Sequence, residues 1–122
     1  DGGSSLLTSD GYDFEVPYSG FMVGGLTGET KIPLDFCNAP LFHSIWLHYA
    51  TEVRKLIKES KLSGVSYAVG TWVDDGCIVF DVSEKVTHSR SAYALCKERN
   101  EDAYYDVEAS KSVFIEKDND NA

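Results

Sequence analysis

The sequence predicts an α+β domain, in which a mainly antiparallel sheet built from hairpins carries two helices on one face. A length of 122 residues, with 43% hydrophobic and 25% charged residues, suits one folded domain. Segments that alternate apolar and polar residues occur in pairs around turn residues, whereas two other segments have the helical period of about 3.6 residues. Hairpins interleaved with helices are typical of α+β folds.

The domain is expected to span residues 12–116. Residues 1–11 are mostly Gly, Ser, Thr and Asp and predict a flexible N-terminal segment, and the polar residues 117–122 predict a disordered tail. The chain does not begin with Met, so an alternative is that it is one domain of a larger protein.

The first elements are expected to be short strands. Alternation over residues 12–16 predicts a strand that Pro17 ends, and residues 21–23 predict a second strand. The residues from Gly24 to Pro33 are rich in helix and strand breakers, which predicts a loop.

A long helix is predicted to begin near Pro40 and to end near Leu62. Asn38 is a favourable N-cap, proline is favourable in a first turn, and Gly64 would follow the end. Its apolar residues recur at steps of three and four and form one stripe: Phe42, Ile45, Trp46, Tyr49, Val53, Leu56 and Ile57.

The clearest hairpin joins residues 66–73 to residues 77–82. Asp75 and Gly76 between two β-rich segments are a strong turn signal, because glycine accepts a positive φ. The register remains open, since the turn type decides whether Trp72 or Val73 lies opposite Ile78.

The C-terminal third is predicted to contain a helix and a second hairpin. The helix spans about Ser89–Arg99, with Ala92, Leu95 and Cys96 on its inner face. The hairpin joins residues 103–107 to residues 112–116.

Charge and composition exclude several classes of function. Eleven Lys and Arg against twenty Asp and Glu give a net charge of −9, which repels nucleic-acid phosphates, so direct nucleic-acid binding is not expected. No apolar run is long enough to span a membrane. Three cysteines without C-x-x-C spacing favour reduced thiols in the cytoplasm over a zinc site or a disulfide framework. We expect no cofactor.

Two sets of residues are candidate sites. Trp72 beside Asp74 and Asp75 at the hairpin tip would suit a basic protein partner, although Trp72 would also suit packing against the long helix. The alternative is a metal-dependent phosphate-processing enzyme that uses clustered carboxylates, which otherwise are solvated surface acids. Its candidate metal ligands are Asp81, Glu101 and Asp106.

Several short motifs occur in an order and spacing that is similar to that of a group of known proteins. They are Val69-Gly70-Thr71-Trp72, Asp75-Gly76, Asp81-Val82-Ser83, Asn100-Glu101 and Ala103-Tyr104-Tyr105-Asp106-Val107, with Gly20-Phe21-Met22-Val23 near the start. This pattern resembles small proteins of bacteriophages and other mobile elements, mostly of unknown function. The resemblance implies an accessory role in the host cytoplasm and no reaction.

Charge and resemblance together predict an acidic, non-enzymatic interaction protein of a phage or mobile element. Its expected partner is a host or defence protein, either basic or nucleic-acid-binding, to which the chain presents carboxylates in place of phosphates.

Overall fold

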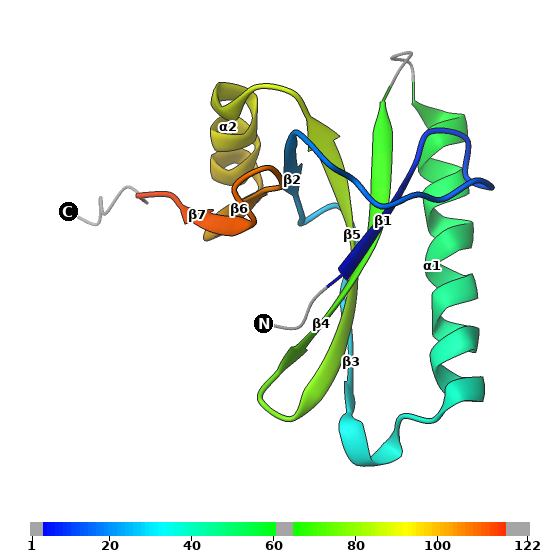
Figure 1. Cartoon of the computed structure of the whole chain (residues 1–122). Helices are drawn as coiled ribbons and strands as arrows, with labels where there is room; N and C mark the ends of the chain where they lie inside the picture. The colour runs from blue at the N-terminus through cyan, green and yellow to red at the C-terminus, as the bar shows by residue number, and fades with distance from the viewer. Residues whose placement is uncertain (1–3, 61–64, 117–122) are drawn as a thin grey trace.

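The computed structural model describes residues 4–60 and 65–116, and it confirms the α+β fold class (Figure 1). A seven-stranded antiparallel sheet packs against two α-helices. The helices are α1, Ala39–Glu59, and α2, Ser89–Arg99, and a 3₁₀ turn, η1, spans Leu34–Phe36. The strands are β1 Ser4–Thr8, β2 Phe21–Val23, β3 Thr30–Pro33, β4 Ser66–Asp74, β5 Cys77–Val86, β6 Ala103–Asp106 and β7 Lys111–Phe114.

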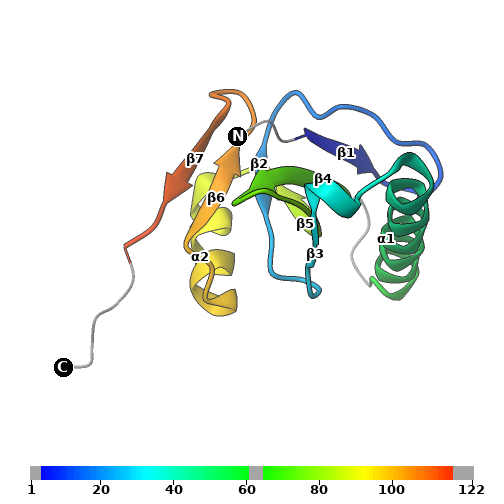
Figure 2. The ribbon, with the colours of Figure 1, turned by 90° about the horizontal axis from the view of Figure 1, so that it is seen from below.

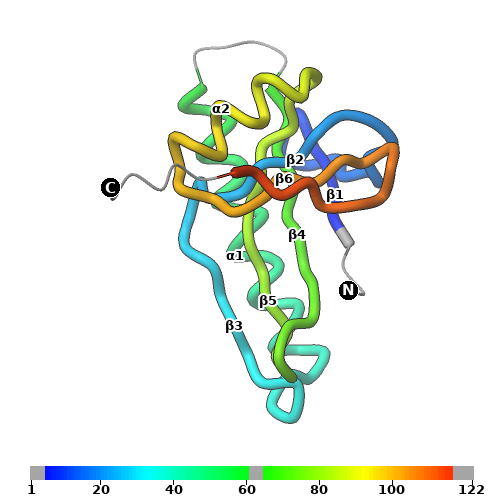
Figure 3. Tube along the Cα trace, turned by 90° about the vertical axis from the view of Figure 1, so that its left-hand side faces the viewer, coloured from blue at the N-terminus to red at the C-terminus, as the bar shows by residue number. Residues whose placement is uncertain are grey.

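The β4–β5 hairpin is the centre of the sheet. The strand order is β1-β4-β5-β2-β6-β7, and β3 also pairs with β5. Strands β2 and β3 lie along the same side of β5, with β3 opposite residues 77–80 and β2 opposite residues 84–86 (Figure 3). The stretch of β5 between them, residues 81–83, therefore has a strand partner only in β4 among the described residues.

Both helices cover the same face of the sheet. Phe80 and Val82 pack in the cluster beneath α1. Residue 84 of β5 points to the same face as residues 80 and 82. Its partner Val23 packs beneath α2 with Ala92 and Cys96. Because alternate residues of a strand point to one face, the two clusters lie on one side of the sheet.

Helix α1 forms as the sequence predicts. The Asn38 side chain accepts the Leu41 N–H at 2.9 Å, which satisfies one of the free donors of the first turn. Tyr49 and Val53 are buried in the main core. The other five predicted stripe residues pack against that cluster: Phe42, Ile45, Trp46, Leu56 and Ile57. The helix ends at Glu59, earlier than the predicted end near Leu62, because Ser60 already has an extended backbone; Leu62 and Gly64 themselves lie outside the described residues.

The hydroxyl of Tyr49 in α1 forms hydrogen bonds to β3 and to the segment that precedes it. It lies 2.6 Å from Thr30 Oγ1, and it donates to the Gly28 carbonyl at 3.1 Å. Tyr49→Phe keeps the ring beside Phe80 and removes both hydrogen bonds of the hydroxyl, so it should cost about 1 kcal/mol of unfolding free energy. Urea unfolding measures this loss, with Tyr93→Phe as the control because Tyr93 is exposed. Equal stability of the two variants would contradict it.

The structure resolves the register of the central hairpin. Asp75 and Gly76 have φ of 52° and 72°, the two positive values of a type I′ turn. Val73 therefore lies opposite Ile78, and Trp72 lies opposite Val79. The final hairpin and helix α2 also lie where the sequence predicts, although β6 and β7 are shorter than expected.

The predicted strand over residues 12–16 is wrong. Asp10 Oδ1 accepts the N–H groups of Tyr12 and Asp13 at 2.8 and 2.9 Å, which forms a local turn in competition with a strand. Glu15 alone makes a bridge, to Leu7.

Two further expectations are corrected. The segment 1–11, expected to be flexible, contains β1, which pairs with β4 and buries Leu7 against Met22 and Ala68. The expected loop from Gly24 to Pro33 ends in β3, which pairs with β5. The predicted tail, residues 117–122, lies outside the described residues.

Candidate functional site

Three elements meet at one end of the molecule, at the bottom of Figure 1. They are the turn between β4 and β5, η1, and the first turn of α1. The Leu34 N–H donates to the Gly76 carbonyl at 2.9 Å and so joins η1 to the hairpin turn. We call this end the tip; it consists of Leu34, Asp35, Phe36, Leu41, Val73, Asp74 and Asp75.

Apolar side chains of the tip are exposed. Phe36 is 71% exposed and Leu34 45%, whereas the core residues Phe80 and Val82 have no exposed surface. Val73 and Leu41 are also exposed, from the two neighbouring elements. Apolar surface that gathers at one place and is rimmed by polar groups is typical of interaction sites.

The acidic side chains of the tip differ in their partners. Asp74 forms an ion pair with Lys31 at 3.4 Å, in which both side chains are largely exposed. Asp35 and Asp75 are exposed and form no ion pair within residues 4–60 and 65–116. The tip therefore combines exposed apolar surface with at least two carboxylates that are available to a cationic partner.

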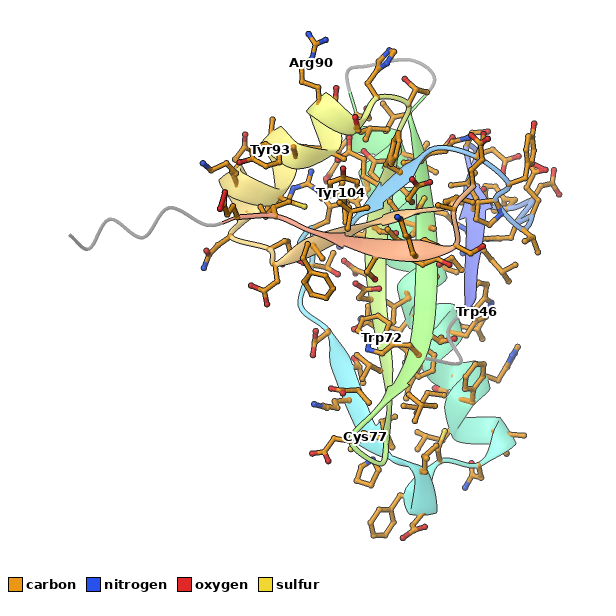
Figure 4. The ribbon with its side chains drawn as sticks, turned by 60° about the vertical axis from the view of Figure 1, so that its left-hand side comes forward. Trp46, Trp72, Cys77, Arg90, Tyr93 and Tyr104 are labelled. Carbon is orange, nitrogen blue, oxygen red and sulfur yellow. The ribbon has the colours of Figure 1, made fainter. Side chains whose placement is uncertain are left out.

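Trp72 lies on the face of the sheet opposite the helices (Figure 4). It shares a row with Val79 and Lys31, and Val79 is buried although neither α1 nor α2 covers this face. Packing of Trp72 against the long helix is therefore excluded, because Thr71 and Val73 point to that side. The half-buried indole is the cross-strand neighbour of Val79, on the face opposite the exposed Val73 of the tip.

A shallow groove continues from the tip along the helix-covered face. Its volume is about 240 Å³. Thr71 follows Val73 along the same face of β4, and Phe42 follows Leu41 in α1, so the groove opens beside the tip. Its walls are Leu6, Phe42, His43, Trp46, Val69 and Thr71.

Two of the three candidate metal ligands come together. A carbon atom added at Gly24 as a Cβ would lie 3.1 Å from Asp81 Oδ2 and 3.4 Å from Glu101 Oε1, so both carboxylates border the same small space. Burial, with the charges of Glu29 and Glu101, raises the pKa of Asp81 to about 7. Asp106 is at the opposite end of β6, where its carboxylate accepts the Ala109 N–H at 3.1 Å.

The carboxylates consequently do not provide a three-ligand set. Within the described part of the chain, no group of three or more His, Cys, Asp or Glu side chains is arranged to hold a metal ion.

The sequence predicted the hairpin part of the tip and the start of α1, but it did not predict η1 or that these three elements lie together. Three apolar residues, Leu34, Phe36 and Leu41, lie on both sides of the Asn38 cap, outside the periodic stripe of the helix. Apolar residues that no predicted element can bury are the signal that would have indicated this surface.

Within residues 4–60 and 65–116, no helix is both long enough and apolar enough to cross a membrane. No protein-family model, curated protein or solved structure matches this chain at a significant level.

Proposed function

We propose that this chain is an acidic, non-enzymatic interaction protein that binds a basic protein partner through the tip. One observation carries the proposal: exposed Leu34 and Phe36 lie beside Asp35 and Asp75, whose carboxylates form no ion pair with any other described residue. Apolar anchors supply affinity when they are buried in a complex, whereas surrounding charges steer the encounter and select the partner.

The charge of the whole chain acts in the same direction. A net charge of −9 attracts a cationic surface from a distance, and the carboxylates of the tip then meet its Lys or Arg side chains. Phe36 is the principal anchor because it is the most exposed apolar side chain of the tip. The groove beside the tip would accept an apolar side chain of the partner.

The resemblance to phage and mobile-element proteins adds the class of partner. Within this proposal the partner is a host or defence protein whose basic surface ordinarily faces nucleic acid, and the acids of the tip occupy that surface in place of phosphates. The chain would act in the cytoplasm of the host cell.

Variants of the tip test this function in a capture experiment from host lysate. Phe36→Ser and the double change Asp35→Lys with Asp75→Lys should each lower the amount of the specific captured protein at least tenfold. Capture by the unchanged protein should weaken as salt is raised, because screening reduces exposed charge interactions. Quantitative mass spectrometry measures the recovery.

Matched changes outside the tip control for nonspecific binding. Tyr18→Ser removes an aromatic residue that is 82% exposed, and Glu59→Lys reverses an exposed acid at the end of α1. Both should leave capture unchanged. The proposal fails if no basic protein is captured. It also fails if the control variants lose capture of that protein as completely as the tip variants do.

A further inference from the structure

The strands at the two ends of the order β1-β4-β5-β2-β6-β7 have edges that are protected differently. On β1, the Leu7 N–H and carbonyl bond to Glu15 at 2.7 and 2.8 Å, so a crossing segment occupies part of that edge. Strand β7 is the opposite edge, at the end of the sheet farthest from α1 (Figure 2). Within residues 4–60 and 65–116, no strand pairs with its outer side.

One hydrogen bond determines which main-chain groups of β7 point outward. Ile115 N–H donates to the Asp102 carbonyl at 2.9 Å, in line with the β6–β7 ladder. Main-chain groups alternate in direction along an antiparallel strand, so Val113 also faces β6, whereas Ser112 and Phe114 face outward. An edge with outward N–H and C=O groups is a template for another strand.

The side chains of this edge alternate in size on the helix-free face. Phe114 is 76% exposed and lies beside the small Ala103, whereas Tyr105 is 42% exposed and lies beside the small Ser112. Tyr104, between these rows, points to the other face and contacts Phe21. The exposed ring of Phe114 thus has a small residue as its neighbour on β6.

We propose that β7 pairs antiparallel with β7 of a second copy of this chain, about a twofold axis at Val113. In this register Ser112 lies opposite Phe114 of the second copy, and the two exchange main-chain hydrogen bonds in both directions. The ring of Phe114 from the second copy then lies over Ser112, toward Tyr105. Each bulky ring is next to a small residue, so the edge is complementary to itself.

Charge gives this pairing a distinctive dependence on salt. Each copy carries a net charge of −9, so two copies repel and added salt should strengthen their association. Capture of a basic partner by the tip should weaken with salt. The opposite signs distinguish this inference from the proposed function, on which it does not rest.

Sedimentation velocity over a range of protein concentrations tests the pairing at low and high salt. The unchanged protein should approach twice the monomer mass at high concentration, more readily in high salt. Ser112→Pro removes an outward donor and no bond of the β6–β7 ladder, so the monomer should keep its fold while the association weakens at least tenfold. Phe114→Ser should weaken it similarly by removing the ring.

The control is Phe36→Ser, which changes the tip and should leave the association unchanged. Circular dichroism and thermal unfolding establish that each variant is folded. A protein that stays monomeric in high salt overturns the inference, and so does a dimer that survives both β7 changes, because its interface would lie elsewhere.

Discussion

Asp81→Asn should raise the unfolding free energy above neutral pH by roughly 2 to 4 kcal/mol, with little effect near about pH 4. Burial is the largest cause, and together with the charges of Glu29 and Glu101 it raises the pKa of the Asp81 carboxyl from 3.8 to about 7. An amide of the same shape occupies this space without a charge.

The sign follows from where the proton is held. Between pH 3.8 and about 7 the folded chain keeps the proton on Asp81, whereas the unfolded chain has lost it. The stability of the unchanged protein therefore falls as pH rises through this window and levels off above it. The asparagine variant lacks this fall. Urea unfolding midpoints, measured at intervals across the window, give the difference curve.

Two carboxylate variants separate Asp81 from general charge effects. Glu101→Gln removes one of the charges beside Asp81, so it should bring the pKa down and recover part of the stability at high pH. Glu98→Gln removes an exposed acid of α2 and should change stability little at any pH. A difference curve between Asp81→Asn and the unchanged protein that is flat with pH would contradict the raised pKa.

The carboxylate pair illustrates what the sequence could not reveal. Asp81 and Glu101 are twenty residues apart in the chain, and both carboxylates lie beside Gly24, at the point where the pairing of β2 with β5 has ended at Val23. Motif resemblance marked both residues, but their proximity depends on where strand pairing stops. Asp106 belongs to the same resemblance and lies elsewhere, so shared motifs did not imply a shared site.

Elements with local causes were predictable. The α1 stripe follows from a period within one segment, and the hairpin turn follows from the positive φ that Asp75 and Gly76 adopt. Strand β1 has no comparable local signal, because its pairing with β4 joins segments about sixty residues apart in the chain. The alternation over residues 12–16 was a local signal that the Asp10 turn overrides.

The candidate site was predictable to a similar extent. The turn signal placed Asp74 and Asp75 at an exposed hairpin end, where they lie. The side of the sheet on which Trp72 lies depends on the register, which the turn type alone decides. Phe36 belongs to the site only because η1 lies against the β4–β5 turn. This contact joins segments that are distant in the chain, so it could not be predicted from local sequence.

The side chain of Arg99 fastens α2 to the sheet, and Arg99→Met should cost roughly 2 to 4 kcal/mol of unfolding free energy. Its guanidinium bonds to Glu84 Oε1 at 2.6 Å and to the Gly24 carbonyl at 3.1 Å. The side chains of the ion pair are only 14% and 20% exposed, so water cannot fully replace the lost partner. The variant leaves a largely buried carboxylate without its counter-charge.

A second change distinguishes the pair from the packing of the arginine stem. Adding Glu84→Gln to Arg99→Met removes the carboxylate charge that Arg99→Met leaves without a counter-charge, so the double variant should recover at least half of the lost stability. Lys55→Met breaks the exposed pair with Glu52 on α1 and should cost less than about 0.5 kcal/mol. If Arg99→Met costs no more than Lys55→Met in urea unfolding, this contact does not hold α2. A double variant as unstable as the single one would assign the loss to the stem and the Gly24 carbonyl, since the charge of Glu84 would then contribute nothing.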